Sequence, residues 1–140
     1  MKIFTFISLF FLFVACSSPT NNLIGKWKLE SIDYSPYFAE VSEEVKTMFQ
    51  EKMEDQTKRM MGRTFFEFKK DNSMRLESPN FENEIVPFEG KWNYNKTQDS
   101  VIFDLEGLEH YKIKTFTESK LVISTNESPK RILSFSKIDL

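Results

Sequence analysis

From residue 64 onward the sequence alternates between apolar and polar side chains with a period of two, the spacing of a β-strand with one buried face. The alternating runs are TFFEFKK, MRLES, GKWNY, SVIFDL, HYKIKTF, KLVIS and RILSFSKI, separated by short turn-forming stretches. NFENEIVPF predicts a further short strand, which Pro87 limits to a sheet edge or a strand end. Such consecutive antiparallel strands predict a mainly β fold, an up-and-down β-barrel of about eight strands. A β-sandwich is the second choice, because only closure removes exposed edges.

A helical period interrupts this pattern between the first strand, within LIGKWKLESI, and the second. Ser35-Pro36 is typical of a helix start, with serine as the N-cap and proline at the first helical position. Apolar residues then recur at helical spacings, and they are Phe38, Val41, Val45, Met48, Phe49, Met53 and Met60. The spacing predicts one amphipathic helix from Pro36 to Met61, ended by Gly62.

The N-terminal segment MKIFTFISLFFLFVAC has the charge and length pattern of a secretory leader. Lys2 precedes an apolar run too short for a comfortable membrane span, and the single cysteine of the chain, Cys16, follows it. The stretch Phe13-Val14-Ala15-Cys16 resembles a bacterial lipobox. This resemblance implies removal of residues 1–15 and attachment of an acyl chain such as palmitate to Cys16. An ordinary secretory leader with an incidental cysteine is the alternative.

Residues 16–22 are then expected to form the lipidated cysteine and a short polar tether, and residues 23–140 are long enough for one domain. Because Ser17 is not aspartate, resemblance to Gram-negative lipoproteins implies sorting to the outer membrane. The expected location is therefore the cell envelope, with the domain lipid-anchored at the outer membrane and facing the periplasm.

Charge and the scarcity of reactive side chains argue against several classes of function. Without Lys2 of the leader, 18 of the 19 basic side chains remain against 21 acidic ones, a net charge of −3 that argues against nucleic acid as a partner. His110 is the single histidine, and with no cysteine besides Cys16 it offers no zinc site or catalytic triad. We therefore expect no enzyme activity, no metal and no cofactor.

The stretch LIGKWKLESI resembles the Gly-x-Trp start of the lipocalin and fatty-acid-binding-protein superfamily. The later pattern FFEFKKDNSMRL … EGKWNY … SVIFDL … HYKIKTFTESKLVIS is similar to bacterial lipocalin-like domains, and the resemblance covers about residues 22–138. It implies that Trp27 plugs one end of the barrel, that Arg131 packs across its ring, and that the helix caps the barrel mouth. Gly25 then lets the chain cross the barrel end closely. The Arg-x-Tyr pair that holds a carboxylate in fatty-acid-binding proteins is absent, so carriage of fatty acid does not follow.

These expectations lead to a lipid-anchored barrel that binds a small hydrophobic or amphipathic molecule by burial of apolar surface. The candidate lining residues are Trp27, Phe66, Phe68, Trp92, Tyr94, Phe103 and Tyr111. Met48 and Met53 are the candidate lid residues on the helix, because flexible thioethers adapt to different apolar partners. The sequence leaves open a closed core built from the same residues, with the helix packed permanently on it.

A second hypothesis is a structural or inhibitory envelope lipoprotein, which binds an unidentified protein partner through its outer surface and loops. Its contact region is expected in SPNFENEIVPF, residues 78–88, where Phe81 is expected to be exposed. A third and more distant hypothesis is an isomerase-like enzyme, for which Tyr94, Tyr111 and Arg131 are the polar candidates in the pocket.

Overall fold

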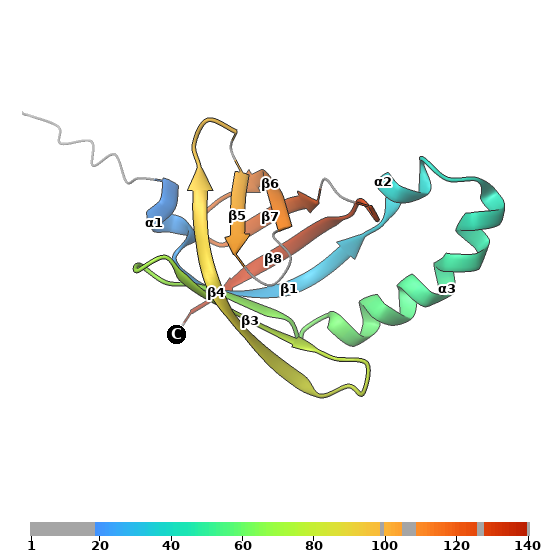
Figure 1. Ribbon diagram of the computed structural model, residues 1–140, viewed down its shortest axis with the longest axis horizontal. Helices are drawn as coiled ribbons and strands as arrows, with labels where there is room; N and C mark the ends of the chain where they lie inside the picture. Colours follow the sequence, from blue (N-terminus) through green and yellow to red (C-terminus); the bar gives the residue numbers. More distant parts are fainter. Residues whose placement is uncertain (1–18, 99, 105–108, 126–127, 140) are drawn as a thin grey trace, which may run out of the picture.

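The strands expected from the alternating sequence close into a barrel in the computed structural model, which describes residues 19–98, 100–104, 109–125 and 128–139 (Figure 1). The barrel strands are β1 (Gly25–Asp33), β2 (Phe65–Phe68), β3 (Ser73–Pro79), β4 (Ile85–Asn95), β5 (Ser100–Asp104), β6 (Glu109–Phe116), β7 (Lys120–Thr125) and β8 (Ile132–Ile138). The helices of the described part are α1 (Pro19–Leu23), α2 (Ser35–Phe38) and α3 (Glu43–Met60). Residues 1–15 and the expected lipidation site Cys16 lie outside the described residues, whereas residues 19–22 of the expected tether belong to α1.

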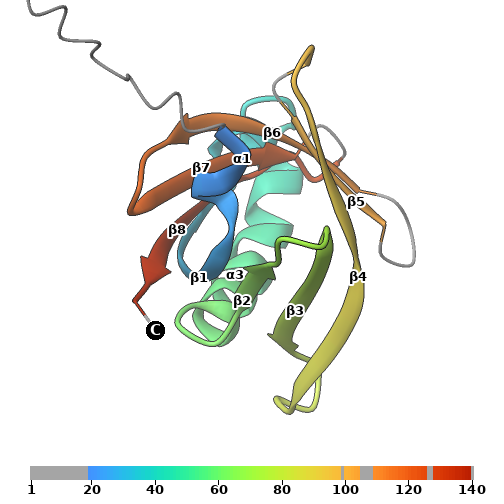
Figure 2. The same ribbon diagram turned by 90° about the vertical axis from the view of Figure 1, so that its left-hand side faces the viewer.

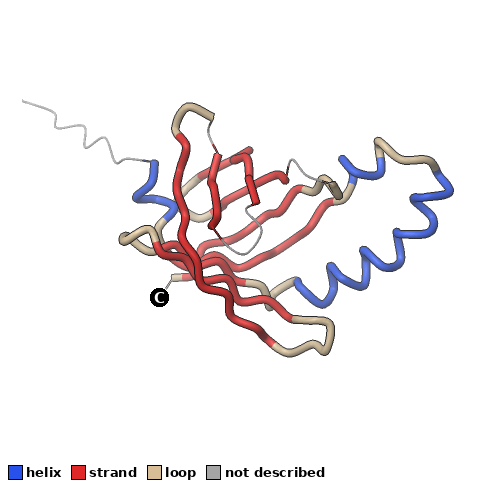
Figure 3. Tube along the Cα trace, in the orientation of Figure 1, coloured by secondary structure: helices blue, strands red, loops and turns tan. Residues whose placement is uncertain are grey.

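Each strand pairs antiparallel with its neighbours in the sequence, and β8 returns to pair with β1, which closes the sheet. The β1–β8 pairing continues along nearly the whole of both strands, with one register shift between Leu29 and Ser31. Figure 3 shows the strands, in red, as one continuous set with the helices outside it. The prediction of an up-and-down antiparallel barrel of about eight strands is confirmed.

The elements outside the sheet divide between the two ends of the barrel (Figures 1 and 2). The short helix α1 lies at the end where β1 begins and β8 finishes, and its Asn22 carbonyl accepts a hydrogen bond from Lys137 of β8. The helices α2 and α3 and the hairpin between β3 and β4 extend from the opposite end. We call the first of these the closed end, and we call residues 35–60 the helical arm.

The helix expected between the first and second strands is present, but its boundaries differ from the prediction of one helix over 36–61. The chain forms the short α2 and the 18-residue α3, with a break that ends at Ser42. Ser42 is extended, with ψ 158°, and its hydroxyl accepts a hydrogen bond from the Val45 N–H at 3.4 Å, so α3 has its own N-cap. Tyr34, and not Ser35, occupies the N-cap position of α2. Because the apolar spacing continues through the break, the sequence pattern alone predicts a single helix.

Strand β4 joins two runs that the sequence pattern separates, NFENEIVPF and GKWNY, into one strand of 11 residues. Its first half, which includes Pro87 opposite Glu77, pairs with β3. Among the described residues, β5 pairs with β4 only from Lys91 onward, so Pro87 lies on a strand edge as predicted. A proline there removes one backbone donor and makes this edge a poorer template for pairing with another chain.

Trp27 is the centre of the closed end, and its side chain is fully buried. Its indole Nε1 donates a hydrogen bond to the Leu23 carbonyl of α1 at 2.8 Å. The ammonium of Lys137 lies 5.2 Å from the centroid of the Trp27 ring and donates to the Asn22 carbonyl at 3.0 Å. The expected plug by Trp27 is present, but the expectation that Arg131 packs across it is wrong. Arg131 precedes β8 and lies at the other end of that strand from Lys137, which is the register partner of Trp27.

Gly25 fits beside this contact because it has no side chain. Its φ of +132° is a value that other residues rarely adopt. A Cβ atom at this position would lie 2.7 Å from Cε of Lys137. The expectation that glycine lets the chain pass closely at the barrel end is therefore confirmed.

We expect Gly25→Ala to lower the free energy of unfolding by about 2–4 kcal/mol, because alanine must adopt a strained φ and also displace Lys137 from Trp27. Gly62→Ala is the matched control, since Gly62 also has a positive φ, +69°, but has nothing within 4 Å of the position of its Cβ. For this control we expect a loss of about 1–2 kcal/mol from the backbone alone. Urea unfolding followed by tryptophan fluorescence measures both losses. Equal losses in the two variants would contradict the packing role of Gly25.

Candidate functional site

The barrel interior holds an aromatic cluster around Phe66 of β2. The Phe66 ring stacks on Phe68 with the ring centroids 6.0 Å apart, and it meets Phe135 and Tyr111 edge-on at 5.3 and 6.5 Å. Phe68 in turn meets Trp92 edge-on at 5.3 Å. Offset and edge-to-face pairs of this kind stabilise packing beyond the burial of apolar area.

Five of the candidate lining residues are buried in the core, each at most 5% exposed, and they are Trp27, Phe66, Phe68, Trp92 and Tyr111. Tyr94 is partly buried and packs against the same core. The side chain of Phe103 lies outside the described residues. The sequence analysis missed Phe135, although the alternation in RILSFSKI puts it on the same face as Leu133.

The helical arm contacts the barrel without burying any residue of α3. Its two candidate lid residues lie in different environments. Met48 is 68% exposed, whereas Met53 is partly buried and faces a cavity. Met60, near the end of the helix, packs against the barrel core. At the other side of the arm, the Lys130 ammonium bonds the Glu40 carboxylate at 2.5 Å. The arm is therefore held near both of its ends.

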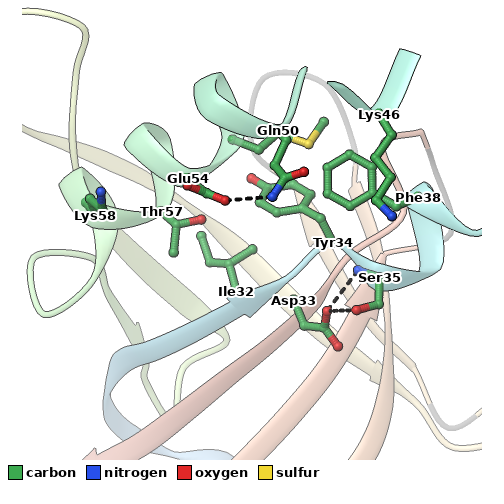
Figure 4. Close-up of a pocket in the computed structure, with 11 residues that line it drawn as sticks. Ile32, Asp33, Tyr34, Ser35, Phe38, Lys46, Gln50, Glu54, Thr57 and Lys58 are labelled. Carbon is green, nitrogen blue, oxygen red and sulfur yellow. Dashed lines mark hydrogen bonds between the residues drawn. The ribbon is translucent and has the colours of Figure 1, made fainter. Parts of the chain in front are cut away.

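A cavity of about 440 Å³ lies between the helical arm and the end of β1, and we call it the arm cavity (Figure 4). Its lining residues are Ile32, Asp33, Tyr34, Ser35, Phe38, Lys46, Gln50, Met53, Glu54, Thr57 and Lys58. Asp33 Oδ1 accepts hydrogen bonds from the N–H and the hydroxyl of Ser35 at 2.8 and 2.5 Å. On α3, the Gln50 amide donates a hydrogen bond to the Glu54 carboxylate at 3.0 Å. The Tyr34 ring lies between this pair and the Asp33–Ser35 pair (Figure 4). Of these residues, the sequence analysis assigned a site role to Met53 alone.

A second cavity, of about 370 Å³, lies between the end of α3 and the β3–β4 hairpin, and we call it the hairpin cavity. Its lining residues are Gln56, Arg59, Met60, Leu76, Ser78, Pro79, Asn80, Phe81, Val86 and Phe88. The hairpin is well bonded, because Asn80 Oδ1 accepts from the N–H groups of Glu82 and Glu84, both at 2.9 Å. Arg63 donates to the backbone carbonyl of Asn83 at 2.8 Å. Phe81 at the tip is 93% exposed, which confirms the expectation from the sequence.

The described ionisable groups with a shifted pKa, Glu30, Asp71 and Arg75, line neither cavity. The Ser136 hydroxyl lowers the pKa of Glu30, the Ser73 hydroxyl lowers the pKa of Asp71, and the Glu77 carboxylate raises the pKa of Arg75. Within the described ranges, no three His, Cys, Asp or Glu side chains converge as a metal site requires. No helix of the described part combines the length and the apolar character needed to cross a bilayer.

Comparisons with known proteins add a family match and several similar folds. Residues 23–123 match the family model of the lipocalin-like domain. A lipocalin-like protein from Bacteroides uniformis has a TM-score of 0.56 at 17% identity, with 84% of this chain and 99% of that chain covered. An uncharacterized protein from Bacteroides eggerthii has a TM-score of 0.54 at 15% identity, with 83% and 99% covered. Bovine odorant binding protein in complex with undecanal has a TM-score of 0.52 at 15% identity, with 89% and 76% covered. No curated protein sequence matches the chain at a significant level.

Proposed function

The chain belongs to the lipocalin-like domain family, and from this membership we propose that it is a lipid-anchored protein that binds a small hydrophobic or amphipathic molecule inside its barrel. The observation that carries the proposal is the difference between the two barrel ends. One end is sealed by Trp27, Leu23 and Lys137. The other is spanned by a helical arm in which no residue of α3 is buried. A ligand would therefore enter from the arm end.

The interior side chains suit an apolar or amphipathic ligand. The candidate lining residues are aromatic, and burial of apolar surface against them supplies roughly 25 cal/mol per Å². Tyr94 and Tyr111 add polar tips that can orient a ligand within an otherwise apolar site. The bovine odorant binding protein of similar fold is described in complex with undecanal, so a saturated aliphatic chain of that length is a reasonable first probe.

We expect the chain without its first 16 residues to bind 1-undecanol, and we expect Val101→Phe to weaken this binding about tenfold or more. Val101 is buried and lies opposite Tyr94 and Tyr111 in the neighbouring strands, so a larger ring there occupies interior space. Ile102→Phe is the matched control, because adjacent side chains of a strand point to opposite faces. Native mass spectrometry counts the bound molecules, and the emission of the two buried tryptophans follows a titration.

The stability of Val101→Phe separates a hollow interior from a filled one. In a hollow barrel the larger ring fits with little loss of stability, whereas in a filled core it lowers the free energy of unfolding by about 1–3 kcal/mol. A loss of that size, together with no undecanol bound to the unsubstituted chain, would contradict the carrier function.

Membrane attachment through Cys16 gives a separate prediction. We expect the N-terminal fragment of the purified full-length protein to begin at Cys16 and to have the mass of an added lipid, while Cys16→Ser keeps residues 1–15. Mass spectrometry of the fragment is the measurement, because an uncleaved leader can also keep the variant in the membrane fraction. A cleaved chain with a free Cys16 thiol would instead indicate an ordinary secretory leader.

A second candidate function is the binding of a protein partner through the β3–β4 hairpin. The observation that favours it is the exposure of Phe81 on a hairpin held by the bonds of Asn80 and Arg63. Phe88, which is also exposed, lines the hairpin cavity together with Phe81. Large apolar side chains presented on an ordered surface are typical of protein contact sites.

We expect a photo-crosslinking benzoylphenylalanine at position 81 to give one discrete adduct in cells, because the tip of the hairpin would lie in the interface. The same residue at position 97, an exposed turn position after β4, is the matched control. Phe81→Ser should change the free energy of unfolding by less than about 0.5 kcal/mol, since the ring is exposed. Identical adducts from both positions, or none from position 81, would exclude the hairpin as a contact surface.

A further inference from the structure

The arm cavity is separate from the barrel interior. Its described lining residues come from the end of β1, from α2 and α3, and from Tyr34 between β1 and α2, and none of these described residues belongs to β2–β8. The volume of about 440 Å³ lies within the range of small-molecule sites. A molecule bound here would contact neither Trp92 nor Tyr111 of the barrel core, because neither lines the cavity. The cavity can therefore bind its own ligand whether or not the barrel holds one.

The apolar part of the arm cavity comes from both of its walls. Ile32 packs against the barrel core on one side, and Met53 of α3 lies on the other. Phe38 of α2 and the ring of Tyr34 complete this surface (Figure 4). A branched aliphatic group, a thioether and two aromatic rings suit the apolar body of a small molecule.

The Tyr34 hydroxyl is the unusual polar group of this cavity. Tyr34 is only 7% exposed, and its hydroxyl is buried with no hydrogen-bond partner among the described residues. Figure 4 shows the ring extending from the end of β1 toward α3, beneath Gln50. Buried hydroxyls in folded proteins are nearly always hydrogen-bonded. This hydroxyl is therefore suited to bond a polar atom of a ligand.

The charges of the lining balance each other. The described lining residues include two ammonium groups, of Lys46 and Lys58, and two carboxylates, of Asp33 and Glu54. Each carboxylate accepts a hydrogen bond from within the cavity wall, from Ser35 or from Gln50. The charges of the described lining residues therefore sum to zero, so they favour neither a cation nor an anion overall, whereas removing an ionic ligand from water costs free energy.

We propose that the arm cavity is a binding site for an uncharged amphipathic molecule. Its apolar body packs on Ile32, Phe38 and Met53, and one polar group bonds the Tyr34 hydroxyl. The site goes beyond the proposed barrel function and does not depend on it. Two contacts join the arm to the barrel beside this space, Met60 against the core and the Lys130–Glu40 ion pair.

The test uses two fluorescent probes with the same ring skeleton. N-phenyl-1-naphthylamine is uncharged and has one N–H, whereas 8-anilinonaphthalene-1-sulfonate has an added sulfonate. With the chain that lacks its first 16 residues, which retains every described residue, we expect saturable binding of the uncharged probe and at least about tenfold weaker binding of the sulfonate. Equal affinity for both probes would overturn the preference for an uncharged ligand.

Tyr34→Phe removes the hydroxyl and keeps the ring. We expect it to weaken binding of the uncharged probe about fivefold, the usual effect of one neutral hydrogen bond. We also expect its urea unfolding midpoint to stay the same or rise, because the hydroxyl has no partner to lose within the described structure. Unchanged probe affinity would overturn the role of Tyr34. A fall in affinity that occurs only together with a fall in the midpoint would indicate a structural role instead.

Met53→Asp and Met48→Asp form a matched pair on the same helix. Met53 lines the cavity, whereas Met48 is exposed outside it, so only the first substitution puts a charge in the proposed site. We expect Met53→Asp to lower affinity for the uncharged probe more than tenfold and Met48→Asp to leave it unchanged. Equal effects of the two substitutions would overturn the site.

Val101→Phe separates this site from the barrel site. We expect the variant to bind N-phenyl-1-naphthylamine as the unsubstituted chain does, even where its binding of 1-undecanol is lost. A loss of both probes in Val101→Phe would place the naphthylamine in the barrel and overturn the arm site. Retention of the naphthylamine with no undecanol binding in any variant would refute the barrel function and leave the arm site supported.

Discussion

The contact of Trp27 with Leu23 and Lys137 is the interaction on which the rest of the fold depends. It joins α1, the first strand and the last strand, and so connects the two ends of the described chain. A barrel closes only when its first and last strands meet, and this pairing has the largest loop to close. A buried indole with a satisfied N–H and a cation over its ring stabilises that closure more than an aliphatic side chain would. Gly25 allows the approach because it has no Cβ to displace Lys137.

Closing one end in this way makes the barrel asymmetric. The helical arm and the β3–β4 hairpin extend from the opposite end (Figure 1). Residues of these elements line the arm cavity and the hairpin cavity. Because α1 lies at the closed end, a lipid on Cys16 would hold that end toward the bilayer. The proposed ligand entrance, the arm cavity and Phe81 would then face away from the anchoring membrane. Exchange of a ligand or docking of a partner would occur in the aqueous space rather than at the lipid surface.

The sequence predicted the parts of this fold that follow from local periodicity. Alternation of apolar and polar residues places Phe66, Phe68 and Trp92 on the apolar faces of their strands, and this does not depend on how the strands are arranged. The same pattern therefore predicted both the strands and the residues of the core. The identity of the cation over Trp27 could not be predicted from the sequence, because Lys137 lies in β8 and Arg131 directly precedes it. Only the register of β8 against β1 places Lys137 opposite Trp27. The break before α3 was missed because the apolar spacing continues through residues 39–42, which lie outside both helices and end at the extended Ser42.

The arm cavity was missed for a more informative reason. An amphipathic helix normally buries its apolar stripe, yet α3 leaves Met48 and Phe49 exposed and turns a face that includes Gln50, Glu54 and Thr57 toward β1. This arrangement contributes little burial to folding, and a helix without buried residues has low local stability. Positions where local pattern and tertiary placement disagree are expected at functional sites, because folding alone gives no reason to keep them. The inner face of α3 combines these polar groups with Met53 and lies opposite Ile32 and the Tyr34 ring, so an amphipathic ligand would complement the arrangement that hid the cavity from the sequence.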